Sequence, residues 1–243
     1  MLELKNISYS AENEDGVKEI LKDISLQIDD GFVAITGPNG GGKSTLAKII
    51  AGIIKPDTGS ILLDGEDITN LTITERAKKG ISFAFQQPVR FKGITVHDLI
   101  SLAAGKKISI SDACEYLSMV GLCARDYINR EVNASLSGGE LKRIEIATVL
   151  ARGTKVSLFD EPEAGIDLWS FNSLIRVFER MHATLGGSII IISHQERILN
   201  IADKVIVLAG GRLKAYGPKD EILPDLLDVS MSACKVLTDK MEG

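Results

Sequence analysis

The sequence predicts an α/β fold with a mixed β-sheet, an antiparallel β region and an inserted helical subdomain. Short apolar runs typical of strands occur near both ends of the chain, and apolar residues fall at helical spacing between 87 and 152. A glycine-rich turn also separates an expected strand from an expected helix near residue 40. We therefore expect a single domain over 1–243, with a core formed by 1–86 and 153–243 and an insertion at 87–152.

The first part of the core is expected to contain strands and one helix. Partial alternation of apolar residues, or a short apolar run, marks each strand. The expected strands are Leu2–Tyr9, Ile20–Ile28, Phe32–Thr36, Ser60–Asp64 and Ile81–Phe85. A polar loop is expected at Ala11–Val17, and a helix at Lys43–Ile53 follows the glycine-rich turn.

The insertion and the second part of the core follow the same logic. Apolar residues at helical spacing predict helices at Val96–Ala104, Ala113–Val120 and Leu141–Leu150. A longer amphipathic helix is expected at Leu168–Leu185. Strand runs return, with a hairpin turn at Gly210–Gly211. These strands are Val156–Phe159, Ile189–Ile192, Val205–Leu208 and Leu213–Tyr216.

The glycine-rich turn has the spacing of a phosphate-binding loop, G-x-x-x-x-G-K-[ST]. It follows an expected strand and opens an expected helix, which is the context that this motif requires. Glycines let successive N–H groups point at phosphate oxygens, and the helix N-terminus adds positive potential. The lysine can reach the β- and γ-phosphates and the serine hydroxyl can ligate Mg²⁺. The residues are Gly37, Pro38, Asn39, Gly40, Gly41, Gly42, Lys43, Ser44 and Thr45.

Two carboxylates end the apolar strand at Val156–Phe159. In an open parallel sheet, ligands gather at the carboxyl ends of the strands. Asp160 is therefore expected to hold Mg²⁺ through water, and Glu161 to orient and polarise an attacking water. By itself this pair would suggest only a charged strand end, and the phosphate loop gives it a catalytic interpretation.

Composition and charge exclude several other classes of protein. A net charge of −5 argues against a nucleic-acid binder, which needs a basic face. The three cysteines lack the spacing of a disulfide framework or a zinc site, so we expect reduced thiols in the cytoplasm. No signal peptide is visible, and the most apolar run, Ile189–Ile192, is far shorter than the roughly 20 residues that cross a bilayer. Any association with a membrane is expected to run through a partner.

The string LSGGE makes the chain resemble the ABC (ATP-binding cassette) ATPases, whose signature motif is usually written LSGGQ. With the phosphate loop and the acidic pair, the resemblance covers nearly the whole chain and implies hydrolysis of ATP with Mg²⁺. It also implies that the signature acts on ATP held by a partner cassette, in a homodimer or with a related ABC subunit. The signature residues are Leu136, Ser137, Gly138, Gly139 and Glu140.

The resemblance implies roles for four further residues. Tyr9 matches an aromatic that stacks on adenine, although a core tyrosine is the alternative. Gln86 matches the glutamine that senses Mg²⁺ and the γ-phosphate, and the neighbouring Gln87 is an alternative for this role. Asp167 matches the loop that crosses to the partner, and His194 matches the switch histidine. The implied catalytic set is Glu161, His194 and Lys43, and the implied Mg²⁺ set is Ser44, Gln86 and Asp160.

Two kinds of ABC protein fit best. The strings AFQQP, SGGELKR and SHQERIL resemble SufC, the ATPase of iron–sulfur cluster assembly, whose partners are SUF scaffold proteins of the SufB/SufD type. The strings DEP and PDTGSILLDGEDIT resemble ATPase subunits of membrane importers, whose partner is a membrane subunit. We expect the SufC-like role, with the transporter role as the alternative. Val89, Phe91, Ile94 and Val96 are expected either to dock that partner or to pack the core of the insertion.

Overall fold

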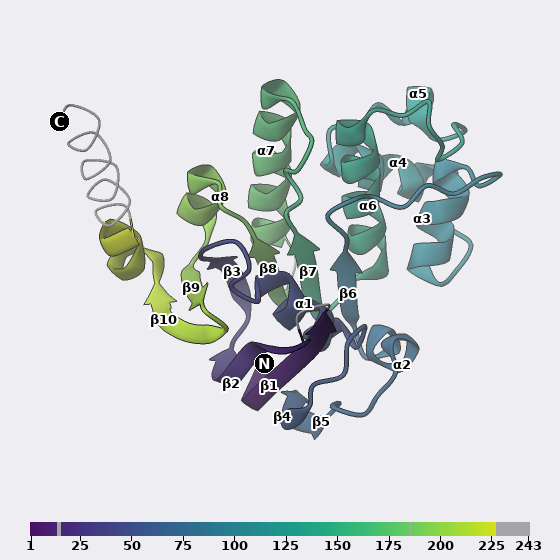
Figure 1. The fold of residues 1–243 in the computed structure, drawn as a ribbon. Coiled ribbons are helices and arrows are strands. Elements are labelled where there is room, and N and C mark those ends of the chain that lie inside the picture. Colours follow the sequence, from purple (N-terminus) through teal and green to yellow (C-terminus); the bar gives the residue numbers. More distant parts are fainter. Residues whose placement is uncertain (14–15, 185, 227–243) are drawn as a thin grey trace, which may run out of the picture.

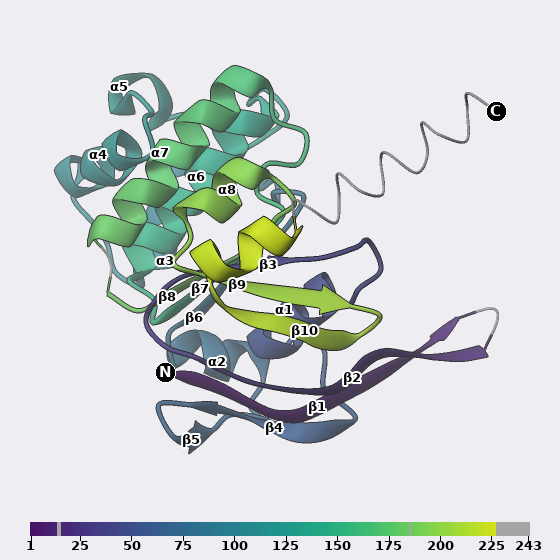
Figure 2. The same ribbon diagram turned by 90° about the vertical axis from the view of Figure 1, so that its left-hand side faces the viewer.

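The computed structural model describes residues 1–13, 16–184 and 186–226. They form an α/β fold with two β-sheets (Figure 1). Viewed from the side, the helices of residues 96–201 lie on one side of the larger sheet, and the antiparallel sheet lies on the other side (Figure 2). The predicted fold class, with a mixed sheet, an antiparallel region and inserted helices, is confirmed.

The larger sheet has six strands in the order β10-β9-β3-β8-β7-β6. Every neighbouring pair is parallel except β9 and β10, which are joined by the predicted hairpin. The strands are β3 (Gly31–Thr36), β6 (Ile81–Ala84), β7 (Val156–Asp160), β8 (Ser188–Ile192), β9 (Lys204–Ala209) and β10 (Arg212–Pro218). The central parallel strands are nearly continuous apolar runs because both faces of the sheet are covered.

The smaller sheet is antiparallel, in the order β2-β1-β4-β5. Its strands are β1 (Leu2–Asn13), β2 (Gly16–Ile28), β4 (Thr58–Leu63) and β5 (Glu66–Asp67). The predicted polar loop at Ala11–Val17 is wrong over most of its length, because β1 and β2 stay paired as far as Asn13 and Gly16. Ladder hydrogen bonds come from the backbone, so polar side chains on both faces do not prevent pairing. The hairpin projects beyond the rest of the fold (Figure 2).

Helices α1, α2, α7 and α8 pack on the core, and residues 219–226 are also helical. Three of them carry an apolar stripe or follow a strand end: α1 (Lys43–Ala51), α7 (Leu168–Thr184) and α8 (Glu196–Ile201). The fourth, α2 (Ile73–Lys78), was not predicted, and neither was α8. The Thr72 and Glu75 side chains form a reciprocal capping box at the start of α2. Its Arg76 is 1% exposed and donates to the carbonyl oxygens of Ile49, Ile50, Thr69 and Leu71. Arg76 therefore ties the C-terminal end of α1 to α2.

The inserted helices lie between β6 and β7. They are α3 (Val96–Ala104), α4 (Ile110–Met119), α5 (Ala124–Tyr127) and α6 (Gly138–Arg152). Of the four apolar residues expected either to dock a partner or to fill a core, Val96 is fully buried, whereas Val89 is 50% exposed. Phe91 packs partly against the core. Val96 therefore packs the core of the insertion, and docking of a partner at Val89 stays a prediction.

The two faces of the larger sheet bury separate cores. Alternate residues of β3 show the division, because Phe32 and Ala34 belong to one cluster while Val33 and Ile35 belong to the other. The first cluster contains the inserted helices, α7 and α8, and the second contains α1 and the smaller sheet. Cys114 and Cys123 are free thiols, and Cys234 lies outside the described residues. Within 1–13, 16–184 and 186–226, no helix is long and apolar enough to cross a bilayer.

Candidate active site

The glycine-rich turn between β3 and α1 borders a cleft of about 510 Å³. The cleft collects residues from four distant parts of the sequence, because the carboxyl ends of parallel strands meet at one edge of the sheet. Its lining includes Gln86 and Glu161 from the segments that follow β6 and β7. The remaining lining residues are Lys18, Ile20, Asn39, Gly40, Gly41, Gly42, Lys43, Ser44 and Thr45.

Two glycines of the turn could not be replaced without moving the backbone. Gly37 has φ 131°, and a Cβ atom there would lie 1.9 Å from the carbonyl oxygen of Leu208. Gly42 has φ 96°, and its Cβ would lie 2.5 Å from a Leu21 side-chain carbon. The turn can pass this close to β2 and β9 only with glycine, which also gives access to the positive φ values.

Lys43 is 6% exposed and is folded back over the turn. Its ammonium donates to the carbonyl oxygens of Gly37 at 2.8 Å and Pro38 at 2.9 Å. Burial lowers the pKa of Lys43, and the carboxylates of Glu161 and Asp160 oppose that shift. The lysine therefore lies in the phosphate loop with its charge beside the cleft, where it can bind an anion.

Ser44 and Asp160 are in direct contact. The Ser44 hydroxyl donates to Asp160 Oδ1 at 2.9 Å. Burial raises the pKa of Asp160, and the hydrogen bond from Ser44 opposes that effect. A hydroxyl oxygen beside a carboxylate forms part of a hard-oxygen ligand set that suits Mg²⁺. The residues present therefore fit the predicted metal at two of the three expected ligands.

Gln86, the third expected ligand, contacts the neighbouring Glu161. Its amide Nε2 donates to Glu161 Oε2 at 2.7 Å. Gln86 rather than Gln87 is part of the cleft lining, which favours the first of the two alternatives for the sensing glutamine. A direct role for Gln86 in binding Mg²⁺ stays a prediction.

Glu161 and His194 face each other at the end of the sheet. Glu161 has φ 44°, which is rare for a residue with a side chain, and its N–H donates to the Ile192 carbonyl at 3.0 Å. His194 Nε2 lies 3.8 Å from Glu161 Oε1. Burial lowers the pKa of His194, and the Lys43 ammonium acts in the same direction. The Glu161 carboxylate lines the cleft, and the imidazole of His194 lies beside it without being part of the lining.

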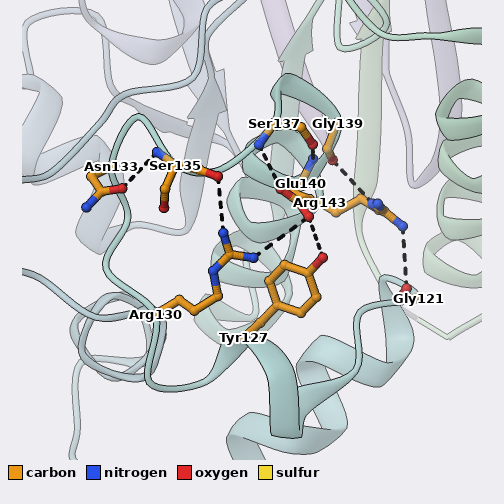
Figure 3. A network of polar contacts seen from close by, with 9 residues as sticks. All are labelled: Gly121, Tyr127, Arg130, Asn133, Ser135, Ser137, Gly139, Glu140 and Arg143. Atoms are coloured by element: carbon orange, nitrogen blue, oxygen red, sulfur yellow. Dashed lines mark hydrogen bonds and ion pairs between the residues drawn. The ribbon is translucent and has the colours of Figure 1, made fainter.

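The signature residues start helix α6 and lie outside the lining of this cleft. Ser137 and Gly138 are exposed, and the N–H of Ser137 donates to Glu140 Oε2 at 2.7 Å (Figure 3). The other Glu140 oxygen accepts from the Tyr127 hydroxyl, and Arg130 Nη1 lies 3.9 Å from it. The Glu140 side chain therefore makes contacts within its own subunit, and its predicted action on a partner's ATP stays a prediction.

The predicted dimer loop packs against the signature. A Cβ atom at Gly139 would lie 2.9 Å from Ser170 Oγ, so glycine lets the two segments approach closely without displacing the Ser170 side chain. Asp167 Oδ1 accepts from the N–H groups of Trp169 and Ser170 at 3.0 Å each, which caps α7. These hydrogen bonds lower the pKa of Asp167. Contact of Asp167 with a second protomer stays a prediction.

Tyr9 is not among the residues that line the cleft. The extended pairing of β1 and β2 places it opposite Leu21, where it packs partly buried against the second core cluster. This packing agrees with the core alternative, and the stacking of Tyr9 on adenine stays a prediction. The strand residues that line the cleft are Lys18 and Ile20. Their i, i+2 spacing on a strand that extends to Gly16 was the signal that sequence reasoning missed.

A buried ion pair at the start of the glutamine segment was also missed. Lys142 on α6 is 2% exposed, and its ammonium donates to the Phe85 carbonyl and to Glu145 Oε2, 3.1 Å away. Glu145 Oε1 in turn accepts from the Phe85 N–H at 3.1 Å. The pair thus holds both backbone groups of the residue before Gln86. The i, i+3 spacing was visible in the sequence, but burial of the pair was not.

The family model described as "ABC transporter" matches residues 21–164, which contain the glycine-rich turn, the signature and the acidic pair. The chain belongs to the ABC transporter family. It is therefore an ABC ATPase, and ATP and Mg²⁺ are its nucleotide and metal.

Relatives and solved structures agree with this family. An uncharacterized ABC transporter ATP-binding protein of Methanocaldococcus jannaschii is 40% identical over 84% of this chain and 86% of its own length. The sulfate/thiosulfate import ATP-binding protein cysA of Cucumis sativus is 33% identical over 91% of this chain and 63% of its own. The chain spans 40% of the length of a putative ABC transporter ATP-binding protein of Vibrio vulnificus, with 34% identity.

A solved structure with a similar fold is the ATP-binding cassette MJ0796, in a dimeric post-hydrolysis state bound to ADP and Pi. It superposes with a TM-score of 0.80 and is 26% identical, covering 90% of this chain and 99% of that one. The strands and helices that carry the cleft therefore have the arrangement of a known nucleotide-binding cassette.

Proposed function

We propose that this chain is the ATP-hydrolysing subunit of a membrane transporter of the importer type, and that it works as a nucleotide-driven dimerisation switch. The observation that carries the proposal is the separation of two half-sites. The cleft holds the phosphate loop, Glu161 and Gln86, while the exposed signature start at Ser137 and Gly138 is not part of its lining. Importer and transporter names among the relatives support the same assignment.

Within the cleft, each side chain has a distinct task in hydrolysis. Lys43 and the N–H groups of the turn bind the β- and γ-phosphates. Bound Mg²⁺ would neutralise charge that develops on the transferred phosphoryl group, and Ser44 and Asp160 would hold it. Glu161 accepts a proton from the attacking water, and Gln86 keeps that carboxylate in place. His194, neutral near pH 7, donates from its imidazole N–H toward the γ-phosphate.

Dimerisation follows from the signature. The first turn of α6 presents the N–H groups of Gly138 and Gly139 and the positive end of the helix dipole to an anion. In our proposal that anion is the γ-phosphate held by the phosphate loop of the partner cassette. ATP then joins two subunits, and hydrolysis removes the ligand they share, so the dimer opens.

An apolar groove beside Gln86 is suited to the membrane partner. A cleft of about 520 Å³ lies between α2, β6 and α6, and a hollow of about 200 Å³ adjoins it. Phe83 and Phe85 line both, and Ile73 and Val89 along their edges are 48% and 50% exposed. A partner helix seated there would touch Phe85 and so act on the adjacent Gln86.

ATP turnover and light scattering test the proposal. We expect wild-type protein to hydrolyse ATP, and Lys43→Ala to lose most of its affinity for ATP because the buried ammonium beside the cleft is gone. Wild-type protein without nucleotide should be mainly monomeric. A protein that neither hydrolyses ATP nor changes its mass with nucleotide would contradict the proposal.

The second candidate is the SufC-like role, favoured by the strings AFQQP, SGGELKR and SHQERIL, with Gln195 following the histidine. The relatives named above carry no name of that kind, so we place it second. Capture of the native partner distinguishes the two roles. A complex that needs detergent and contains a protein with several apolar spans supports the transporter. A soluble complex with a scaffold protein supports the assembly role, and Ile73→Glu should weaken capture in either case.

A further inference from the structure

Glu163 carries a buried carboxylate that the proposed mechanism does not use. It lies between Glu161 and Asp167, with its side chain turned toward the end of β8. One carboxylate oxygen accepts a hydrogen bond from the Ser193 hydroxyl. The other, Oε2, is buried and has no hydrogen-bond partner in the part of the chain that the structure describes. Burial raises the pKa of Glu163.

Ser193 immediately precedes His194 and is completely buried. Its N–H donates to the Ile35 carbonyl at 3.1 Å, and its hydroxyl oxygen accepts from the Gln195 N–H at 3.0 Å. The hydroxyl therefore donates to Glu163 and accepts from the residue on the far side of His194. This arrangement fixes the backbone on both sides of the histidine, and with it the direction of the imidazole.

The other side of Glu163 faces the signature. The Glu163 carbonyl accepts from the Ile166 N–H at 3.2 Å, which closes a short turn toward Asp167. The carbonyl of Gly165, in this turn, would lie 3.5 Å from a Cβ atom at Gly138. One short segment thus touches the exposed signature start at one end and the histidine segment at the other.

We propose that Glu163 is a positioning residue that joins the loop 163–167 to the segment of His194, so that seating of this loop at a dimer contact sets the histidine for hydrolysis. The inference rests on the proposed nucleotide-driven dimer and adds to it a route within one chain. A buried carboxylate oxygen without a partner is an unfavourable feature that proteins keep mainly at functional sites. The hydrogen bond to Ser193 is the contact that gives Glu163 this role.

Four variants test the link: Glu163→Ala, Ser193→Ala, their combination, and Glu163→Gln. Loss of the hydrogen bond should lower kcat about tenfold to a hundredfold, because small misplacements of a catalytic group have effects of that size. The affinity for ATP, measured with a fluorescent nucleotide analogue, should stay within about threefold of wild type, since neither side chain lines the cleft. The double variant should be no slower than the slower single variant. Glu163→Gln keeps an oxygen acceptor and should recover most of kcat.

Ser157→Ala is the matched control. Ser157 is 2% exposed and bonds to the Thr154 hydroxyl at 2.7 Å, near the amino end of β7 and away from the cleft. The proposal is overturned if Ser193→Ala has the same kcat as Ser157→Ala. It is also overturned if the reductions in kcat of the two single variants multiply in the double variant, or if the affinity for ATP falls while kcat does not. Glu163→Gln and Ser193→Ala carry the test if Glu163→Ala does not fold. A wild-type protein without ATP turnover would instead overturn the proposed function itself, and the inference with it.

Discussion

Replacement of Lys142 by methionine tests the buried clamp on the glutamine segment. Methionine keeps the length of the side chain and removes the ammonium. The Phe85 carbonyl then loses its side-chain donor, and the Glu145 carboxylate loses the cation 3.1 Å away. Glu145 keeps only the Phe85 N–H at 3.1 Å. The variant therefore leaves a partly buried negative charge without compensation.

The expected loss of stability follows from burial. Removing one partner of a buried ion pair costs about 3–5 kcal/mol of unfolding free energy. The Glu145 side chain is 18% exposed, whereas that of Lys142 is 3% exposed, so water screens part of the effect and the lower end applies. We expect a loss of about 3 kcal/mol, which lowers Tm by about 6–12 °C in a chain of this size.

The loss should also depend on pH. Burial already raises the pKa of Glu145, and the Lys142 ammonium opposes this shift. In the variant the folded-state pKa rises further above its unfolded value, so the folded protein binds more protons than the unfolded chain. Stability therefore falls as pH rises through the folded-state pKa, and the destabilisation should be larger at pH 8 than at pH 5.

Urea unfolding followed by circular dichroism at both pH values measures these effects. Lys142→Met combined with Glu145→Gln should recover more than half of the loss, because the unpaired charge is gone and the amide still accepts from Phe85. Lys106→Met, at an exposed position, is the control and should change stability by less than about 0.5 kcal/mol. A loss below about 1 kcal/mol for Lys142→Met, or a double variant as unstable as the single one, would refute the reasoning.

Three further predictions concern Arg76, Glu161 and Trp169. Arg76→Met should lower the free energy of unfolding, measured by thermal unfolding, by about 3–5 kcal/mol, because four backbone carbonyls lose a buried donor. A Tm within error of wild type would show that water replaces the guanidinium as donor. Glu161→Gln should bind ATP but turn over about 10²–10⁴ times more slowly and accumulate as a dimer by light scattering; normal turnover would remove Glu161 from its role. Trp169 is the chain's single tryptophan and is 82% exposed beside the dimer loop. Its fluorescence emission should therefore shift to shorter wavelength when ATP is added to Glu161→Gln. An unchanged spectrum, on a dimer detected by light scattering, would place Trp169 outside the dimer contact.

The glycine-rich turn and the signature could be predicted from the sequence because each motif consists of residues that are close together in the chain. Gly37 and Gly42 are set by the backbone conformation of one turn, and the capping pair of Ser137 and Glu140 spans one helical turn. Ser44 and Asp160 are in contact although 116 positions separate them. The sequence predicted that both bind one Mg²⁺, because Asp160 ends a parallel strand at the edge of the sheet where ligands gather.

The contacts that sequence reasoning missed depend on pairings between distant segments. Tyr9 was expected to stack on adenine from the family resemblance alone, and that role stays a prediction. The structure adds that the pairing of β1 with β2 continues beyond Tyr9. Glu145 meets Phe85 across 60 positions, and Glu163 meets Ser193 across 30. Hydrophobic periodicity predicts which face of a helix or strand is buried, but it does not predict the hydrogen-bond partners of polar residues on that face.

Helix α1 is a short, direct connection between the nucleotide cleft and the apolar groove lined by Phe83 and Phe85. It begins at Lys43 beside the nucleotide cleft and ends at Ala51, which lines the apolar groove. Nine residues of α-helix measure about 13 Å. Arg76 donates hydrogen bonds to the carbonyl oxygens of Ile49 and Ile50 at the C-terminal end of the helix. A helix this short and this firmly anchored resists bending. A displacement of one end therefore moves the other end as part of one rigid body.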